Sequence, residues 1–178
     1  SNVADKKVDN KSRDRLPYVA LISCIVIYST YIIINYPGYA NDDALFQINQ
    51  FFGNVAFDPQ QPPLSTFLIG ICALLGKYTF GVEFGCTIYL LLVAIVLAFV
   101  VLLSVKLLIR LNLKNIFIYI YILFFSFTPI VVYHAGWIDK DTLFGVLFFY
   151  FIVTIVDYLT NKEKSKMPIL KLLILGIL

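Results

Sequence analysis

The sequence predicts an all-α fold, a polytopic transmembrane helical bundle with a long outer first loop that carries juxtamembrane helices. Hydrophobic residues make up 60% of the chain and charged residues only 14%, and the mean hydropathy is +0.86. Soluble domains carry nearer a quarter charged residues. Four stretches approach the roughly 20 apolar residues that cross a bilayer, namely Tyr18–Asn35, Phe84–Val105, Ile116–Tyr133 and Thr142–Tyr158. They must be helical because hydrocarbon offers no water to the backbone.

A fifth apolar stretch begins near Ile169 and runs to the end of the chain. The chain also begins without Met, so we expect it to be a piece of a longer protein. Residues 1–15 read as a basic cytoplasmic segment, and residues 16–178 as the first part of one transmembrane domain.

The shorter run Leu64–Gly76, "LSTFLIGICALLG", has the length of an interfacial, re-entrant or buried helix. If it does not span, almost all basic residues fall on one side of the membrane, and only Lys77 and Lys140 lie opposite. The residues on that common side are Lys6, Lys7, Lys11, Arg13, Arg15, Lys106, Arg110, Lys114, Lys162, Lys164, Lys166 and Lys171. The positive-inside rule therefore predicts a cytoplasmic N-terminus and places Leu64–Gly76 at the outer face.

The same topology gathers acidic residues at the outer face. They lie in a long first loop, residues 36–83, and a short second loop, residues 133–141. The acids are Asp42, Asp43, Asp58, Glu83, Asp139 and Asp141. Two acidic clusters at one membrane level are where we expect chemistry.

The first cluster lies in "NYPGYANDDALFQINQFFG". Asp42 or Asp43 can cap a short amphipathic helix over Ala44–Phe52. One face of this helix is expected to carry Leu45, Ile48 and Phe52, and another Gln47 and Gln50. Capping occupies one carboxylate, and the other is a candidate general base or substrate-holding group.

The second cluster is the D-x-D of Asp139, Lys140 and Asp141. Asp141 or Thr142 can cap the following helix, which leaves Asp139 as the surplus acid. Alternatively, the two carboxylates can present hard oxygen ligands to Mg²⁺ or Mn²⁺ beside phosphate oxygens.

Three further outer residues are open to two interpretations. Lys77 and Lys140 can each meet a phosphate or simply extend toward the membrane surface. His134, the single histidine, is either an interfacial hydrogen-bonding group or a ligand-binding one. The nearby "DPQQPPLSTFLIG" predicts a rigid hook, because Pro62 and Pro63 enforce an extended backbone before the helix they begin.

The order of these parts resembles the GT-C superfamily of integral membrane glycosyltransferases, in particular the bacterial branch related to protein O-mannosyltransferases and aminoarabinose transferases. The resemblance covers most of residues 16–158. The matching segments are "YPGYANDD", "LFQINQFF", "QQPPLSTFLIG" and "WIDKDTLF". It implies a GT-C-like domain in the cytoplasmic membrane whose active face lies outside. It further implies transfer of a sugar from a polyprenyl-phosphate donor to a glycan, lipid or protein of the cell envelope.

Carried onto this chain, the resemblance makes Asp43, or else Asp42, the base that deprotonates the acceptor hydroxyl. Asp139 and Asp141 resemble acids that hold a divalent cation or orient the substrate in some relatives. Gln60 and Gln61 stand where many relatives have His or Lys, so the donor phosphate must depend on other groups. The expected substrate-binding residues are Lys77, Lys140, Gln61 and His134.

Other classes of protein remain open. The acids could serve only as helix caps in a non-catalytic scaffold of the same fold. A transporter would place ionisable residues within its spans near the bilayer centre, and the four predicted spans contain none there. The net charge of +3 is too small and too segregated along the chain to indicate nucleic-acid binding.

Overall fold

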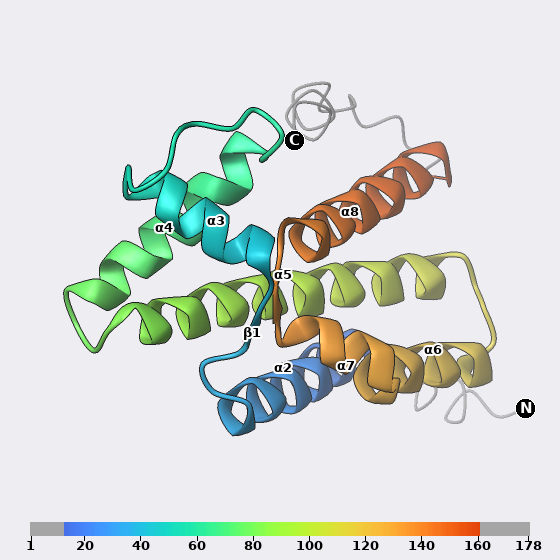
Figure 1. The fold of residues 1–178 in the computed structure, drawn as a ribbon. Coiled ribbons are helices and arrows are strands. Elements are labelled where there is room, and N and C mark those ends of the chain that lie inside the picture. Colours follow the sequence, from blue (N-terminus) through green and yellow to red (C-terminus); the bar gives the residue numbers. More distant parts are fainter. Residues whose placement is uncertain (1–12, 161–178) are drawn as a thin grey trace, which may run out of the picture.

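The computed structural model describes residues 13–160 as a helical protein with one small pair of strands (Figure 1). The elements in chain order are α2 (Leu16–Ile34), β1 (Tyr39–Ala40), α3 (Asp42–Phe51), α4 (Pro63–Lys77), α5 (Val82–Arg110), α6 (Asn115–Phe127), α7 (Pro129–Ala135), β2 (Trp137–Ile138) and α8 (Lys140–Thr160). The helical class predicted from composition is thus confirmed. The expected fifth span near Ile169 and most of the basic N-terminal segment lie outside the described residues.

Within the described part of the chain, α2, α5 and α8 are long and apolar enough to cross a membrane. The protein is therefore a multi-pass membrane protein in a lipid bilayer. α4 is a shorter apolar helix, as the length of Leu64–Gly76 predicted. Large apolar side chains stay exposed on the outer faces of the long helices, as lipid-facing residues should. On α8 they include Phe144, Phe148 and Ile152.

The predicted span over Ile116–Tyr133 is interrupted by a bend, so the segment is either a broken span or a re-entrant one. The segment forms two helices, α6 and α7, that meet at a 48° bend. α7 begins at Pro129, which has no N–H to donate to the carbonyl of Phe125 four residues earlier. The hydroxyl of Tyr28 on α2 donates to that carbonyl instead, at 2.7 Å. Tyr28 therefore satisfies the backbone carbonyl that the proline leaves without its usual donor.

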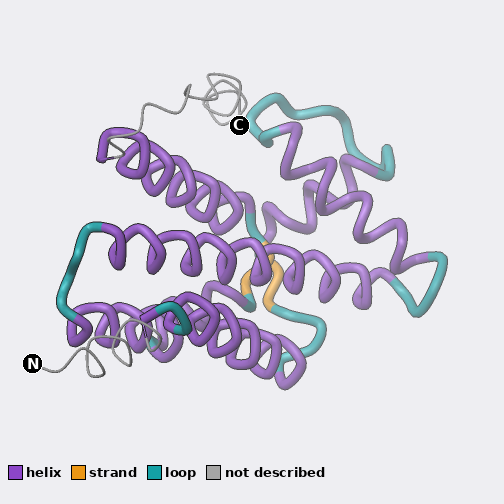
Figure 2. Tube along the Cα trace, turned by 180° about the vertical axis from the view of Figure 1, so that it is seen from behind, coloured by secondary structure: helices purple, strands orange, loops and turns teal. Residues whose placement is uncertain are grey.

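α5 is the central helix of the fold. It runs between α2, α6 and α7 on one side and α3, α4 and α8 on the other (Figures 1 and 2). Of its apolar stretch 56% is buried, against 28% for α2 and 17% for α8. The hydrophobic core therefore lies along α5, and the other long helices cover it.

Two glycines bring α4 against the start of α5. A Cβ at Gly85 would collide with the carbonyl of Cys72, and one at Gly76 with the backbone of Gly85. In the pattern Gly81-x-x-x-Gly85, Gly85 provides this close approach. Gly81 instead precedes α5 with φ of 113°, a conformation that only glycine adopts readily. The helix pair α4–α5 is consequently a tight hairpin.

The strands β1 and β2 place the two acidic segments side by side. They are parallel, with Tyr39 opposite Trp137 and Ala40 opposite Ile138. Each strand is followed within two residues by a helix, α3 at Asp42 and α8 at Lys140. The N-termini of two helices far apart in sequence therefore meet at one level of the molecule, as the charge pattern predicted.

Candidate functional site

Asp43, Lys140 and Gln61 form a closed polar ring where these helices begin. Nζ of Lys140 lies 2.9 Å from Oδ2 of Asp43 and donates to Oε1 of Gln61 at 3.2 Å. Nε2 of Gln61 donates to Oδ1 of Asp43, also at 3.2 Å. The ring joins the first turn of α3, the proline hook and the first residue of α8. Three residues that the sequence singled out separately are thus brought together.

The hook holds Gln61 in place. The carbonyl of Pro62 accepts hydrogen bonds from the hydroxyls of Ser65 and Thr66 in the first turn of α4. Ser65 in turn accepts a hydrogen bond at 2.8 Å from Nε2 of Gln47 on α3. Gln61 is only 6% exposed. The polar ring is therefore anchored on a fixed backbone.

The first amphipathic helix buries a residue of its polar face and exposes one of its apolar face. Gln47 is fully buried, whereas Leu45 is 50% exposed. The reason is the bond from Gln47 to Ser65, which gives this amide a buried partner between α3 and α4. Neither Gln47 nor Ser65 was expected from the sequence to support the site, because nothing in the local pattern shows that the two helices meet.

Both capping assignments made from the sequence are wrong. Oδ1 of Asn41 accepts from the backbone N–H of Ala44 at 2.8 Å, so Asn41 caps α3 and both Asp42 and Asp43 lie in its first turn. Oδ1 of Asp139 accepts from the N–H of Thr142 at 2.6 Å, so Asp139 caps α8. Each helix begins one or two residues earlier than the sequence suggested, and an Asn or Asp at that earlier position takes the cap.

Asp139 is occupied by capping and Asp43 by the polar ring, which leaves Asp42 and Asp141. Among the described residues neither side chain forms a hydrogen bond or an ion pair, and both residues are exposed. Asp139, by contrast, is 7% exposed. The surplus acid of the D-x-D is therefore Asp141 and not Asp139.

The surroundings of Asp43 lower the pKa of its carboxyl. Hydrogen bonding from Lys140 is the largest cause, burial partly opposes it, and the hydrogen bond from Gln61 adds to the lowering. Asp43 is thus held ionised and already satisfied.

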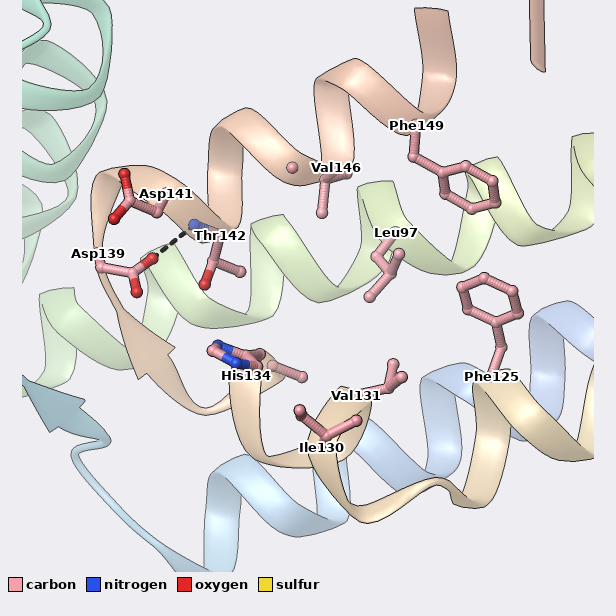
Figure 3. Close-up of a pocket in the computed structure, with 12 residues that line it drawn as sticks. Leu97, Phe125, Ile130, Val131, His134, Asp139, Asp141, Thr142, Val146 and Phe149 are labelled. Atoms are coloured by element: carbon pink, nitrogen blue, oxygen red, sulfur yellow. Dashed lines mark hydrogen bonds between the residues drawn. The ribbon is translucent and has the colours of Figure 1, made fainter. Parts of the chain in front are cut away.

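A cavity of about 470 Å³ lies beside the start of α8 (Figure 3). We call it the acidic groove. Its polar end carries His134, Asp139, Asp141 and Thr142, and the rest of its wall is apolar. The apolar residues come from α5, α6, α7 and α8 and include Leu97, Phe125, Ile130, Val131, Val146 and Phe149. The groove therefore suits a molecule with a polar head and an apolar tail.

A second cavity of about 230 Å³ lies between the start of α4 and α8. We call it the lysine cavity, because Lys140 lines it together with Asp141. Its remaining wall is mostly apolar and comprises Pro62, Leu64, Ser65, Leu143, Phe144 and Leu147. Asp141 lines both cavities, so one acid without a partner among the described residues lies at their junction.

Lys77 does not join the site. It ends α4, whose first residue Pro63 lies next to the ring, and a helix of this length places its ends about 20 Å apart. Nζ of Lys77 lies 5.0 Å from the centre of the Phe52 ring. The expected contact of Lys77 with substrate therefore has no support from this arrangement.

No group of three or more His, Cys, Asp or Glu side chains that could hold a metal ion occurs among residues 13–160. Of the two D-x-D acids, Asp139 already uses one oxygen to cap α8. Mg²⁺ usually binds one or two carboxylates together with waters and substrate phosphates, so the divalent cation stays a prediction.

Comparison with known proteins finds one family. The chain matches DUF6020, described as a family of unknown function, over residues 53–177, which is more than half of its length. The chain belongs to the DUF6020 family. No curated protein and no solved structure matches it. Within the DUF6020 match lie Gln61, His134, Asp139, Lys140 and Asp141, whereas Asp42 and Asp43 precede it.

Proposed function

We propose that this DUF6020 member is a membrane glycosyltransferase of the GT-C type. It would move a sugar from a polyprenyl-phosphate donor to an acceptor at the outer face of the cytoplasmic membrane. The observation that carries the proposal is the position of Asp141 at the start of α8, where it lines both the lysine cavity and the acidic groove. A two-substrate transfer needs a base at such a junction.

The lysine cavity suits the donor. Nζ of Lys140 supplies a positive charge for the phosphate. The apolar wall formed by Leu64, Leu143 and Phe144 offers a path for the prenyl chain along α4 and α8. Because Lys140 is paired with Asp43 in the resting protein, donor phosphate would compete with that carboxylate for the ammonium group.

The acidic groove suits the acceptor. No lysine or arginine among residues 13–160 lines it, so a phosphate would face two carboxylates without a compensating cation from this part of the chain. Hydroxyl groups, in contrast, donate well to Asp139 and Asp141, and His134 lies across from them (Figure 3). The apolar wall would hold the lipid part of a membrane-borne acceptor.

Asp141 is the best placed base. It has no partner among the described residues, whereas Asp43 is engaged by Lys140 and Gln61. In the reaction Asp141 takes the proton of the acceptor hydroxyl while that oxygen bonds to the anomeric carbon. The bond from this carbon to the phosphate oxygen breaks, and polyprenyl phosphate leaves with the electron pair. Asp43 acts as a positioning residue that holds Lys140, and Asp42 stays a second candidate for the base.

A non-catalytic scaffold is the alternative that specific contacts favour. Asp139 caps a helix and Asp43 pairs with Lys140, so two of the four acids already have structural roles. Asp141 discriminates between the two functions because its side chain forms no hydrogen bond or ion pair with other described residues, although as an acid in the first turn of α8 it favours that helix.

The test uses the full-length protein in native membranes supplied with labelled polyprenyl-phosphate sugars. Asp141→Asn is expected to lower transfer by about 10²–10⁴-fold, the usual contribution of a general base, with its melting temperature unchanged. Glu83→Gln is the matched control, because this acid begins α5 and lines neither cavity. Normal transfer by a folded Asp141→Asn variant would remove Asp141 as the base. If Asp43→Asn then abolished transfer, the role would return to Asp43.

A further inference from the structure

A third cavity, of about 380 Å³, lies between the far ends of α5 and α8. We call it the basic cavity. Each helix contributes a stripe of four residues at the spacing i, i+3, i+4, i+7, so each stripe is one helix face. On α5 the stripe ends in Lys106, Leu107 and Arg110, and on α8 in Val153, Thr154 and Asp157. Two matched faces thus enclose a space that is apolar at one end and charged at the other.

The cavity exists because α8 diverges from α5 along its length (Figures 1 and 2). Arg110 closes the gap at the wide end. Its Nη2 lies 2.6 Å from Oδ1 of Asp157 and donates to the carbonyl of Asp157 at 3.0 Å. This ion pair neutralises Arg110 and holds the two helix ends at a fixed separation.

Once Arg110 is paired with Asp157, Lys106 is the charged residue of the cavity lining that remains. It is exposed and has no ion-pair partner among the described residues, and its Nζ lies 5.7 Å from the centre of the Tyr18 ring. Lys106 lies one turn before Arg110 on the same face of α5. The basic cavity therefore carries a net positive charge beside an apolar wall.

The basic cavity also lies at the level of a membrane surface. Tyr89 on α5 donates to the carbonyl of Asp139 at the candidate site. Arg110 follows 21 residues later along the same helix, about 30 Å away, which is the thickness of the hydrocarbon core. A cation at this depth lies among lipid head groups.

We propose that the basic cavity binds the head group of an anionic phospholipid, at the membrane surface opposite the candidate functional site. On binding, the side chain of Lys106 turns from the Tyr18 ring of α2 to the phosphate, and the first methylene groups of the lipid lie along Leu103, Leu107 and Val153. Basic pockets between transmembrane helices recognise such head groups. The proposal is independent of the function proposed above.

The test uses the full-length protein purified in a neutral detergent. Its melting temperature is measured against added short-chain phosphatidylglycerol, short-chain phosphatidylcholine and inorganic phosphate. The wild type is expected to be stabilised by phosphatidylglycerol alone. Lys106→Gln is expected to weaken that binding about five-fold, the usual effect of one basic residue near an anionic surface.

Two variants make the result specific. Lys114→Gln removes an exposed cation near the same end that does not line the basic cavity, and it is expected to bind phosphatidylglycerol as the wild type does. Thr154→Trp fills the cavity without a change of charge. Thr154 donates only to the carbonyl of Tyr150 in its own helix, so this variant is expected to fold and to lose the lipid effect.

Three results would overturn the proposal. Equal stabilisation by phosphatidylcholine would show that the head group is not recognised. Equal stabilisation by inorganic phosphate would indicate a site for soluble anions. If Lys106→Gln and Lys114→Gln lost the stabilisation by phosphatidylglycerol to the same extent, and Thr154→Trp kept it, the lipid would be attracted to the basic surface in general and not to the cavity.

Discussion

Asp43 and Asp141 are the same residue type in two different surroundings. Asp43 accepts hydrogen bonds from Lys140 and Gln61, and its pKa lies below the ordinary value. Asp141 has no partner among the described residues and lines two cavities. A carboxylate that is already satisfied stabilises structure, whereas an unsatisfied one can accept a proton from a substrate.

The lowered pKa of Asp43 predicts a pH-dependent stability. A carboxyl whose pKa is lowered on folding stabilises the protein above its unfolded pKa, and this contribution is lost as the pH falls through the folded pKa. The ordinary value is 3.8. We therefore expect the melting temperature of the wild type to exceed that of Lys140→Gln by a constant amount at neutral and mildly acidic pH. The difference should shrink below about pH 4.

Lys77→Gln is the control for this experiment. Lys77 contacts the Phe52 ring and forms no ion pair in the described part of the chain, so its effect should not change across the same acidic range. A pH-independent difference between wild type and Lys140→Gln would contradict the coupling of Lys140 to Asp43.

The acids of the site were predictable from sequence, but their roles were not. Charge distribution alone placed Asp42, Asp43, Asp139 and Asp141 at one level. Which acid caps a helix depends on where the helix begins, and a shift of one residue exchanges the cap with its neighbour. The sequence therefore could not identify Asp141 as the acid without a partner.

At the scale of elements, the bend between α6 and α7 is the main departure from the predicted spans. Hydropathy averages over a long window and does not register one proline, so residues 116–133 read as one helix. The break at Pro129 turns α7 by 48° and brings His134 into the wall of the acidic groove. The shortness of α4 was easier to anticipate, because the length of an apolar run is a local signal.

The bond from Tyr28 to Phe125 predicts the stability of this bend. Tyr28→Phe leaves the carbonyl of Phe125 without the donor that replaces the missing N–H of Pro129. We expect a loss of about 1 kcal/mol in unfolding free energy, in the range measured for buried hydrogen bonds between membrane helices.

Denaturant unfolding in mixed micelles would measure this loss. Tyr119→Phe is the matched control, because Tyr119 lies on α6, is 44% exposed and forms no hydrogen bond with other described residues. Equal stability of Tyr28→Phe and wild type would show that another group satisfies the Phe125 carbonyl.

At the scale of the whole molecule, the two ends carry opposite charge. Arg13 donates to the carbonyl of Leu113, which brings the start of α2 to the loop after α5. Lys106, Arg110 and Lys114 lie at this same end, and the acidic segments lie at the other. The segregation of charge that the sequence predicted is therefore confirmed. The side of the membrane that each end faces stays a prediction of the positive-inside rule.

Cysteine labelling tests that orientation. Asp58→Cys introduces a thiol beside the proline hook, and Lys114→Cys one at the basic end. In intact cells we expect an impermeant maleimide to label the first and not the second, because basic loops stay in the cytoplasm. Cys24 and Cys72 are buried and Cys86 is half-buried, so the unsubstituted protein measures the background. Labelling of Lys114→Cys alone would invert the proposed topology.

The wall of the acidic groove has a kinetic consequence. Ile130 lines the groove and its apolar side chain is 62% exposed, so we expect a ligand carried in the bilayer to reach the groove by lateral diffusion. The quantity that governs occupancy is then its mole fraction in the membrane and not its concentration in bulk water. Added inert phospholipid should lower the rate of the proposed sugar transfer at constant total substrate, an effect known as surface dilution. A water-borne ligand would show no such dependence.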